Sequence, residues 1–579
     1  MALPEFLDPE KILPISRSTT RVFRTGTWGS RLPEHREKNS PCRTACPAGN
    51  QIPRAIFRAS QGDFDGALSA FLEENPLPGV CGSVCYHPCE FNCNRGEWDG
   101  TVNIRALERA SSEYGTAQPG RLTDRGKDYP VTVIGSGPAG LSAAYHLARM
   151  GHPVTLFEAE DELGGLLHRG IPAYRLPERV LEQDLNRILS LGITVRTGMA
   201  VDGPMLTELR NKSSAVFLAL GAQQEIPLEI SGIELGGITS GVGFLRRVRQ
   251  GIVMDIPPRV VVIGGGNVAI DAALTATKLG AKQVELVCLE RREEMPAQEG
   301  ESQDALEEGV VFYNGWGPRR ILGEGGRAIG VEFVRCVSVR DADGRFRPSF
   351  DERESLVRDA DWVIAAIGQR GDLSFLKGGD FLHRNPDDLL RIDLGTMEGP
   401  VKGLFAGGDL VQMPGSVVEA VAAGKRAALA IHLSVSGSVI GEAEKRVLLC
   451  GETSFSIESL FRPGREWDPN RVVIFEDMEP LFLDHRSPVE LPRLSPDERA
   501  GNFDRIDLSL KEGKAVEEAE RCLFCGTCTG CDRCLLFCPE TCIQPTQELF
   551  YTTDSGYCKG CSVCEAVCLG GVVTMGDTR

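Results

Sequence analysis

The sequence predicts a multidomain protein: an α-helical N-terminal domain, two Rossmann-like α/β domains of which one interrupts the other, and a small C-terminal α+β domain. Three observations lead to this prediction. Glycine-rich turns at 135–140 and 264–269 each follow a short β-type run and open a helical pattern. Cysteines gather near both ends, six within 42–93 and eleven within 522–568. Residues 438–514 are rich in Pro, Glu and Asp and carry no catalytic signature.

Length and composition set the frame for these elements. At about 150 residues per domain, a chain of 579 residues corresponds to about four domains. The hydrophobic share of 42% and the charged share of 25% are ordinary for a folded protein. The net charge of -18 disfavours nucleic acid and anionic membranes as partners. It is compatible with docking to a basic protein.

The cysteines are expected to bind metal rather than to form disulfides. The first residues lack the basic and apolar regions of a secretory leader, and no run of about 18 apolar residues is present. We therefore expect a cytoplasmic protein without a membrane span, in which thiols stay reduced. The three scattered cysteines are expected to be buried packing residues: Cys288, Cys336 and Cys450.

Domain boundaries follow from local patterns along the chain. The N-terminal domain, 1–125, contains helical stretches at 52–71 and 104–114. A joint rich in Pro, Gly and Asp then leads into a strand at 131–134, which opens a βαβ unit. The remaining predicted bounds are 126–255 and 395–437 for the first Rossmann-like domain, 256–394 for the inserted one, 438–514 for a linker or docking segment, and 515–579 for the C-terminal domain.

The first glycine turn has the spacing of a dinucleotide site. Its glycines allow a tight turn, close approach to a pyrophosphate and close helix packing, and the helix N-terminus offers free N–H groups. Glu158 ends the next strand, where an acid can accept from a ribose hydroxyl. Residues 404–409 resemble the second FAD fingerprint of two-dinucleotide flavoproteins, and Ser416 opens a helix that favours negative charge at the flavin. The expected FAD contacts are Gly135, Gly137, Pro138, Ala139, Gly140, Glu158, Gly164, Gly165, Leu166, Arg175, Gly221, Gly408, Asp409, Ser416, Val417 and Val418.

The second glycine turn is predicted to bind NAD(P)H. It repeats the first turn with alanine in place of the third glycine. Glu290, at the end of the following strand, favours NADH because a carboxylate can accept from the 2′-hydroxyl. Arg291 and Arg292 favour NADPH, or form a solvated charged surface. Hydride transfer to a flavin requires no protein acid or base, so no catalytic side chain is assigned. The expected NAD(P) contacts are Gly264, Gly265, Gly266, Asn267, Val268, Ala269, Glu290, Arg291, Arg292 and Gly368.

The C-terminal cysteines match the bacterial two-cluster ferredoxin pattern. Two runs of Cys-x2-Cys-x2-Cys-x3-Cys occupy 528–538 and 558–568. In this pattern the fourth cysteine of each run ligates the other cluster. Single zinc ions would not explain the paired x3 positions. The predicted [4Fe–4S] ligand sets are Cys528, Cys531, Cys534 and Cys568 for one cluster, and Cys538, Cys558, Cys561 and Cys564 for the other.

Several segments together resemble the small subunit of NAD(P)H-dependent glutamate synthase. These are 42–114, both glycine turns, the stretch Gly-Ile-Pro-Ala-Tyr-Arg-Leu-Pro at 170–177, and 407–426. They are also similar to the bifurcating transhydrogenase large subunit and the N-terminal half of dihydropyrimidine dehydrogenase. The fused ferredoxin module resembles that of DsrL-type iron–sulfur flavoproteins, which work beside dissimilatory sulfite reductase. The resemblance implies an NAD(P)H:acceptor oxidoreductase, with sulfur metabolism as one setting, that moves electrons through FAD and [4Fe–4S] clusters.

The resemblance also implies roles for the N-terminal cysteines. The family's inner cluster corresponds to Cys46, Cys85, Cys89 and Cys93. Its outer cluster uses an Arg-Cys-Leu-x-Cys pair, one more cysteine, and a Gln or Glu on a later helix. Here the pair stands at 521–525 instead of before Cys42. Our hypothesis is that a fourth cluster forms when the tail folds back, with ligands Cys42, Glu108, Cys522 and Cys525; alternatively these cysteines are structural. At least three clusters are expected.

Other readings stay open. A true glutamate synthase small subunit is disfavoured by the fused ferredoxin module, and a non-catalytic electron relay by the two intact nucleotide motifs. NADPH-using relatives tend to carry Tyr-Arg-Arg where this chain has Cys288-Leu289-Glu290, which favours NADH. The expected partner is a redox protein, such as a sulfite reductase, a ferredoxin or another oxidoreductase subunit. A homodimer is also expected.

Overall fold

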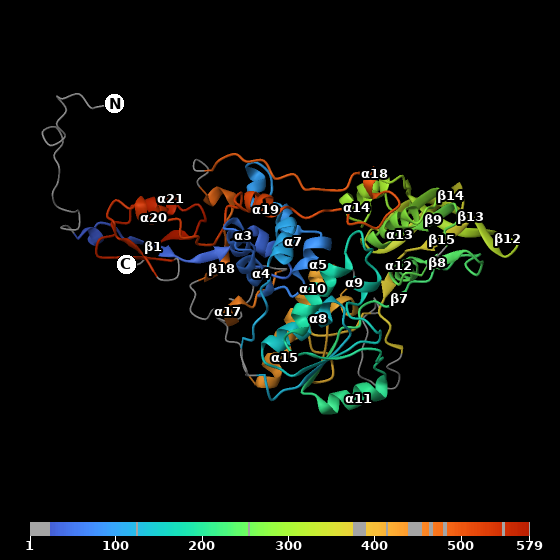
Figure 1. Ribbon diagram of the computed structural model, residues 1–579, viewed down its shortest axis with the longest axis horizontal. Coiled ribbons are helices and arrows are strands. Elements are labelled where there is room, and N and C mark those ends of the chain that lie inside the picture. Colours follow the sequence, from blue (N-terminus) through green and yellow to red (C-terminus); the bar gives the residue numbers. More distant parts are fainter. Residues whose placement is uncertain are drawn as a thin grey trace, which may run out of the picture.

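The computed structural model describes residues 24–122, 126–252, 255–374, 389–412, 415–437, 454–461, 467–478, 483–546 and 550–577. Cys450 lies outside these residues. Within them, no helix is both long and apolar enough to cross a membrane. The C-terminal module and the sheet β12–β14 lie at opposite ends of the long axis, and the helical segments lie between them (Figure 1).

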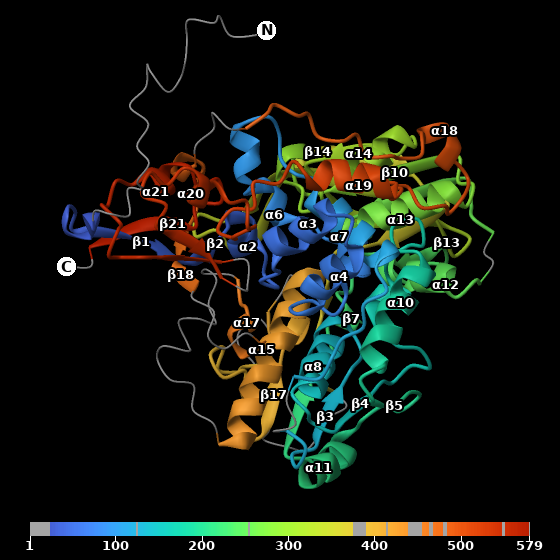
Figure 2. The ribbon, with the colours of Figure 1, turned by 60° about the vertical axis from the view of Figure 1, so that its left-hand side comes forward.

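The first Rossmann-like domain contains a parallel sheet in the order β17-β6-β3-β4-β5. Strands β3, β4, β6 and β17 are short and mostly buried, as expected for a parallel sheet covered by helices, whereas the edge strand β5 is partly exposed. Helices α8 and α15 pack side by side against it (Figure 2). The elements are β3 (Val131–Ile134), α8 (Pro138–Arg149), β4 (Val154–Phe157), α9 (Leu166–Arg169), α10 (Glu178–Leu189), β5 (Thr194–Arg196), α11 (Gly203–Lys212), β6 (Ala215–Leu218), β17 (Leu404–Ala406), η6 (Gly408–Leu410) and α15 (Val417–Ser436).

The second Rossmann-like domain is inserted between β6 and β17. Its parallel sheet has the order β11-β10-β9-β15-β8, and a three-stranded antiparallel sheet β12-β13-β14 extends from it. A two-stranded link between β7 (Gln224–Glu225) and β16 (Gln369–Arg370) marks where the chain enters and leaves. The elements are β8 (Ile238–Ser240), α12 (Gly241–Arg249), β9 (Arg259–Ile263), α13 (Asn267–Lys278), β10 (Gln283–Cys288), η4 (Arg292–Glu294), α14 (Glu299–Glu307), β11 (Val311–Asn314), β12 (Trp316–Glu324), β13 (Arg327–Arg340), β14 (Phe346–Asp359) and β15 (Trp362–Ala365).

The N-terminal region divides between two parts of the molecule. Short helices form a compact unit beside α8 and α15: α2 (Pro41–Ala45), α3 (Ile52–Ser60), α4 (Phe64–Leu72), α5 (Pro78–Val84), α6 (Pro88–Phe91), η3 (Asn94–Glu97) and α7 (Ile104–Tyr114). The residues before them, η2 (Thr25–Thr27), β1 (Arg31–His35) and β2 (Glu37–Asn39), extend toward the C-terminal module instead. There β1 pairs antiparallel with β21 (Val573–Asp577).

The described parts of 454–514, a stretch that lies within the expected linker or docking segment, contact all the other domains. Strand β18 (Trp467–Val472) pairs with β2, and residues 483–510 run out to the second Rossmann-like domain and back (Figure 1). Arg499 is only 1% exposed there and binds Asp304 at 2.9 Å. The other elements are α17 (Glu458–Phe461), η7 (Phe475–Asp477), α18 (Pro496–Arg499) and α19 (Glu512–Ala519). Side-chain hydrogen bonds hold much of 483–510 in place, so the path of this stretch could not be predicted from helical or strand periodicity.

The C-terminal module contains two short helices and two small β-pairs. Helices α20 (Arg533–Leu536) and α21 (Val563–Ala566) each follow the first two cysteines of a run. Strands β19 (Ile543–Pro545) and β20 (Tyr551–Thr553) form a hairpin between the two runs. Its core consists largely of cysteine side chains with Ile543, Tyr551, Val573 and Met575. Because β1 is the partner of β21, this module is completed by the N-terminal end of the chain.

One buried ion pair joins three of these parts. Lys425 of α15 and Glu74, just after α4, lie 2.6 Å apart, and both side chains have zero exposure. Lys425 also donates to the carbonyls of Ala48 and Phe455. Glu74 accepts from the Ile457 backbone N–H at 3.2 Å. Every polar atom of the pair therefore has a partner from a different segment, as buried charges require.

We expect Lys425→Met to destabilise the protein strongly. Loss of the ammonium leaves the Glu74 carboxylate buried without a cation, at a cost of about 3–5 kcal/mol. The midpoint of urea denaturation, followed by far-UV circular dichroism, should fall accordingly. Glu74→Gln combined with Lys425→Met should recover part of the loss. The control is Lys212→Met, which removes an exposed pair with Glu208 and should change stability by less than about 1 kcal/mol. Equal effects of the two lysine substitutions would contradict the assignment.

Candidate functional site

The first glycine turn is shaped by two close backbone contacts. Gly135 has φ +101°, and a Cβ there would lie 2.3 Å from the Ala219 carbonyl oxygen. A Cβ on Gly140 would lie 1.9 Å from the Gly135 carbonyl oxygen, so α8 can pack on β3 only with glycine at this position. At Gly137, by contrast, no atom lies within 4 Å of the Cβ position. The N-terminus of α8, with Pro138 and Ala139, is therefore open to a phosphate.

Glu158 closes this turn from the neighbouring strand. Its Oε2 accepts from the Ser136 backbone N–H at 2.9 Å and from the Ser136 hydroxyl, while Oε1 accepts from the Glu160 N–H at 3.1 Å. The Gly164 N–H donates to the Ser136 hydroxyl at 3.1 Å. Gly165 and then Leu166 follow, and the Gly165 Cβ position is 3.0 Å from the Gly137 Cα. The glycines of the first turn, Gly164 and Gly165, and the acid Glu158 thus lie together; all of them were predicted to contact FAD.

Asp409 and the start of α15 face the same edge of the sheet. A Cβ on Gly415 would lie 2.3 Å from an Asp409 carboxylate oxygen, so glycine is required for this approach. Burial, with the nearby Glu419, raises the pKa of Asp409 to about 6. Gly408 (φ +72°) lies against Ala139. The helix begins at Ser416, whose hydroxyl accepts from the Glu419 N–H at 3.3 Å, and continues through Val417 and Val418.

Gly221 and Arg175 were also expected to contact FAD, but the structure places them differently. Gly221 adopts φ +65° after β6, on the same edge of the sheet. Arg175 instead contacts the second Rossmann-like domain: its guanidinium pairs with Asp271 of α13 at 2.7 Å and with Glu301 of α14. The expectation that Arg175 contacts FAD is therefore not supported by its placement. Both acids lie far from Arg175 in the chain, so no local pattern predicted this pairing.

The second glycine turn repeats the geometry of the first. Gly264 has φ +141° and lies against the Ala366 carbonyl, while Gly266 is open and begins α13 with Asn267, Val268 and Ala269. The Glu290 carboxylate overhangs this turn, with Oε2 2.6 Å from the Cβ position of Gly265. Gly368 (φ +121°) accepts from the Ile226 N–H at 3.0 Å, which fixes the link between the domains.

The two arginines after Glu290 are placed differently. Arg292 pairs with Glu299 at 3.0 Å and lies over the Phe312 ring, with 5.1 Å between the guanidinium carbon and the ring centroid. Arg291 is exposed and precedes η4. Of the three residues, Glu290 therefore lies nearest to the glycine turn.

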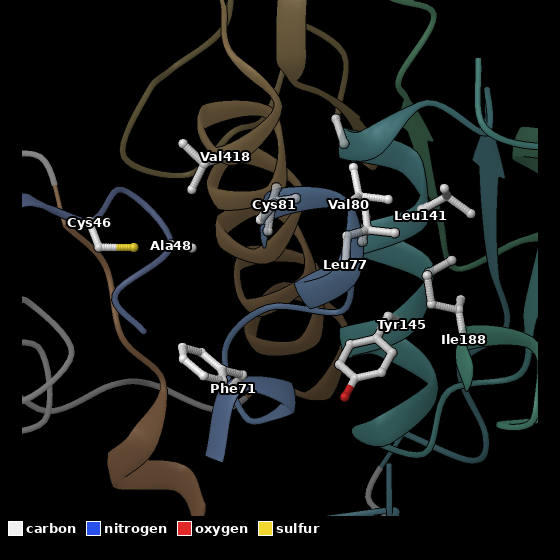
Figure 3. Close-up of a cluster of buried hydrophobic side chains, with 14 of the residues drawn as sticks. Cys46, Ala48, Phe71, Leu77, Val80, Cys81, Leu141, Tyr145, Ile188 and Val418 are labelled. Atoms are coloured by element: carbon white, nitrogen blue, oxygen red, sulfur yellow. The ribbon is translucent and has the colours of Figure 1, made fainter. Parts of the chain in front are cut away.

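Four cysteines and one glutamate line a buried cavity beside α15, here called the inner site. The cysteines come from the loop after α2, from α5 and its end, and from α6: Cys46, Cys81, Cys85 and Cys89. Val418, in the first turn of α15, lines the same cavity, and Figure 3 shows it between Cys46 and Cys81. Burial raises the pKa of the Cys46 thiol to about 11. The helix expected to face the flavin therefore also borders the inner site.

Glu108 of α7 is the fifth residue of this cavity. Its Oε1 accepts from the side-chain amides of Asn75 at 2.9 Å and Asn50 at 3.2 Å. Burial raises the pKa of its carboxyl to about 8. The structure thus places Glu108 with Cys46 rather than with Cys42, contrary to the hypothesis from the sequence.

Cys93 is also placed differently from the expectation. It does not line the inner site but a second cavity, here called the composite site, together with Cys42, Cys522 and Cys525. The tail cysteines therefore do reach Cys42, as the sequence hypothesis held, but with Cys93 in place of Glu108. Nothing in the spacing of the cysteines from Cys81 to Cys93 indicated that Cys93 and Glu108 would exchange places between the two sites.

The ferredoxin-type cysteines lie in two crossed groups. Burial and the thiols of Cys568, Cys528 and Cys531 raise the pKa of Cys534 to about 12. Burial and the thiols of Cys558, Cys561 and Cys538 do the same for Cys564. Cys542 lies 3.5 Å from Cys538 and also lines the second group's cavity. Each x3 cysteine is thus close to the other run, as the two-cluster pattern predicts.

None of these thiol groups is arranged around a single metal ion. Among the residues that the structure describes, no three His, Cys, Asp or Glu side chains are placed to hold one ion, and the cysteines are free thiols. Thiolates that ligate different irons of one cluster are more widely spaced than the ligands of one zinc ion. Cysteine thiolates are the usual ligands of [4Fe–4S] clusters, so these cysteine groups fit such clusters by their donor chemistry.

Comparison with known proteins agrees with this geometry. The family model of pyridine nucleotide-disulphide oxidoreductases matches residues 129–424, which contain both glycine turns and Asp409. The chain belongs to the pyridine nucleotide-disulphide oxidoreductase family. A second model, dihydropyrimidine dehydrogenase domain II with its 4Fe-4S cluster, matches residues 36–119. The protein is thus an NAD(P)H-dependent iron–sulfur flavoprotein oxidoreductase.

Three relatives each match a larger part of the chain than either family model does. The chain is 35% identical over 526 residues, 84% of its length and 75% of the relative, to the NADPH-Fe(3+) oxidoreductase subunit beta of Geobacter sulfurreducens. It is 34% identical over 517 residues, 84% of this chain and 70% of the relative, to the NADP(+)-dependent formate dehydrogenase subunit beta of Moorella thermoacetica. The PreT homolog of NAD-dependent dihydropyrimidine dehydrogenase from Salmonella typhi is 33% identical over 408 residues, 68% of this chain and 91% of the relative.

Proposed function

We propose that this family member is the nucleotide-oxidising subunit of a redox complex, passing electrons from NADH to a protein acceptor. The observation that carries the proposal is the position of Val418, which belongs to the first turn of α15 and also lines the inner site. The residues expected to hold FAD and those expected to hold a cluster therefore share one wall. When bound, FAD and the nicotinamide supply hydride transfer and the change from two-electron to one-electron chemistry.

The chain's own residues orient and isolate these groups. The open turns at Gly137 and Gly266 offer helix N-termini to the two pyrophosphates. Asp409 lies where it can hold the ribityl chain, and the α15 N-terminus favours negative charge on the flavin. Burial of the inner-site thiols excludes water from the path. No side chain has to move a proton for hydride transfer.

The acceptor is proposed to dock at the C-terminal module. Leu536 and Phe537, beside Cys534 and Cys538, are 73% and 50% exposed. Apolar side chains next to a cluster give a partner a surface to bury, and the net charge of -18 favours a basic partner. Two of the relatives are named as subunits beta of larger oxidoreductases. A sulfite reductase partner rests on the sequence resemblance alone.

Anaerobic titration with NADH tests the function. NADH should bleach the flavin absorbance of the purified protein and support reduction of an artificial one-electron dye. A double variant, Leu536→Ser with Phe537→Ser, should keep both activities because neither residue lies near the nucleotide sites. Bleaching by neither NADH nor NADPH would instead favour a non-catalytic relay. Capture of the large amidotransferase subunit would favour a glutamate synthase small subunit.

Glu290 is proposed to select NADH over NADPH. Its carboxylate overhangs Gly265, where it can accept from a ribose 2′-hydroxyl and would repel a 2′-phosphate. Glu290→Gln should lower kcat/KM for NADH by about 10- to 100-fold, the value of a charged hydrogen bond, and raise it for NADPH. Glu293→Gln, a neighbouring exposed acid, is the matched control. A preference unchanged by Glu290→Gln would show that another residue reads the ribose.

The inner-site ligands are proposed to be Cys46, Cys85, Cys89 and Glu108. A [4Fe–4S] cluster needs four ligands, and five candidates line the cavity. Glu108 is favoured over Cys81 because two amides orient its carboxylate, as hydrogen-bonded partners orient metal ligands. Cys81 lies within α5 and is 1% exposed.

Matched variants distinguish these two candidates. Glu108→Ala should lose about four iron atoms per chain, the content of one cubane, while Glu108→Gln should retain them. Cys81→Ala should keep the iron content and the electron paramagnetic resonance spectrum of the reduced protein. Iron loss in Cys81→Ala with retention in Glu108→Ala would reverse the assignment.

A further inference from the structure

Four buried cysteines from opposite ends of the chain surround the composite site. Cys42 and Cys93 come from the N-terminal helical unit, and Cys522 and Cys525 come from the segment before the ferredoxin module. We propose that these four thiolates hold an additional [4Fe–4S] cluster, a cluster assembled from both ends of the polypeptide. The matched dihydropyrimidine dehydrogenase domain spans 36–119, so it contains only half of this ligand set.

The two N-terminal ligands are held by short helices. Cys42 lies in the first turn of α2, where the Ser40 side chain accepts from the Arg43 N–H at 3.3 Å and caps the helix. Cys93 immediately precedes η3. Pro41, Ile56 and Val102 complete an apolar lining. Both cysteines therefore line a preformed, largely apolar cavity.

Arg521 brings the two tail ligands to this cavity. It is 1% exposed and lies immediately before Cys522. Its guanidinium donates to Glu518 at 2.8 Å, to Asp99 at 3.2 Å and to the Thr101 carbonyl at 3.0 Å. Arg95, which lines the cavity, donates to the Arg521 carbonyl at 3.0 Å. A buried arginine with this many partners fixes the position of the chain on both sides of it.

The loop between the tail ligands is wound tightly around the site. Phe524 and Gly526 adopt φ +51° and +72°, and the Gly526 N–H donates to the Gly570 carbonyl at 2.7 Å. The Phe524 N–H donates to the Cys522 sulfur, and the Asn94 amide donates to the Cys525 sulfur, each at 3.4 Å. The Ser40 hydroxyl lies 3.1 Å from the Cys42 sulfur. Such N–H···S and O–H···S bonds stabilise thiolates bound to iron.

Other roles for the four cysteines account less well for this arrangement. All four are free thiols, so the group is not a pair of disulfides. No three of them are placed to hold a single ion, which disfavours zinc. Ordinary buried cysteines act as small apolar residues and need no hydrogen-bond donors directed at their sulfurs. N–H groups donate to two of the four sulfurs and all four cysteines line one cavity, which together favour thiolate ligands of a cluster.

The composite site lies between the inner site and the ferredoxin module. Ile52 and Ile104 line both cavities, so the two sites are neighbours. On the other side, Cys528 follows Cys525 by three residues, and its N–H donates to Glu37 at 3.2 Å. A cluster here would connect the flavin side of the molecule to the ferredoxin module. It would also tie the two ends of the chain together.

Iron content and cysteine variants of the full-length protein test this inference. Wild type reconstituted anaerobically should contain about sixteen iron atoms, four cubanes, rather than twelve. Cys522→Ser with Cys525→Ser should lose about four iron atoms while keeping FAD and the resonance signals of the ferredoxin clusters. Cys93→Ser should lose the same four, and combining all three substitutions should cause no further loss. Cys336→Ser, a buried cysteine of β13, is the control and should lose none.

Several results would overturn the proposal. These are a wild-type content near twelve iron atoms, zinc bound in place of iron, or iron unchanged in the tail variant. Loss of about eight iron atoms in the triple variant would assign Cys93 to the inner site. If the variants fail to fold, native mass spectrometry of the wild-type protein decides, because the mass of four clusters supports the proposal and that of three refutes it. None of these readouts depends on which nucleotide or acceptor is used.

Discussion

The buried pair of Lys425 and Glu74 is the constraint on which the arrangement of the sites depends. Neither charge can reach water, so the segments that supply their partners must come together for the chain to fold. One partner is the carbonyl of Ala48, two residues after Cys46. Another is the carbonyl of Phe455, in the chain returning from α15. The pair therefore holds the first cysteine loop against the helix that borders the flavin edge of the sheet.

Buried ion pairs also hold the other segments that carry cysteines. Glu458 accepts from Arg43 at 3.0 Å and Arg54 at 3.1 Å, which secures α2 and α3 around the two sites. Arg521 plays a similar part for the tail. The helices that carry the cysteines are only a few residues long and bury little apolar surface of their own. Buried ion pairs therefore supply the positional accuracy that longer helices supply elsewhere.

Local spacing made part of this molecule predictable from the sequence. The glycine turns, the strand ends at Glu158 and Asp409, and the two ferredoxin runs are each recognised from residues close together in the sequence. The Rossmann-like folds follow from the first three of these signals. The placements of Arg175 and Glu108 and the path of 483–510 depend on partners far away in sequence. The pairing of β1 with β21 joins residues more than 500 positions apart, and neither strand carries a pattern that identifies the other. The Arg-Cys-Leu-x-Cys motif could be recognised in the sequence. Only the structure shows that Cys93 lines the same cavity as the two cysteines of this motif.

The two contacts between the chain ends have a common consequence for the ferredoxin module. It cannot be an independent domain joined by a tether, because β1 completes its sheet and Lys38 donates to the Gly526 carbonyl at 2.9 Å through its N–H. If the composite site also binds a cluster, the module's position relative to the flavin is set by iron–sulfur bonds as well as by strand pairing. A tethered carrier would exchange electrons only when it docks, whereas a fixed module keeps the distance between successive sites constant. The segment 483–510 leaves the N-terminal helical unit at Arg486, reaches the NAD(P) domain at Arg499 and returns to α19, so its contacts also fix the chain just before the tail cysteines.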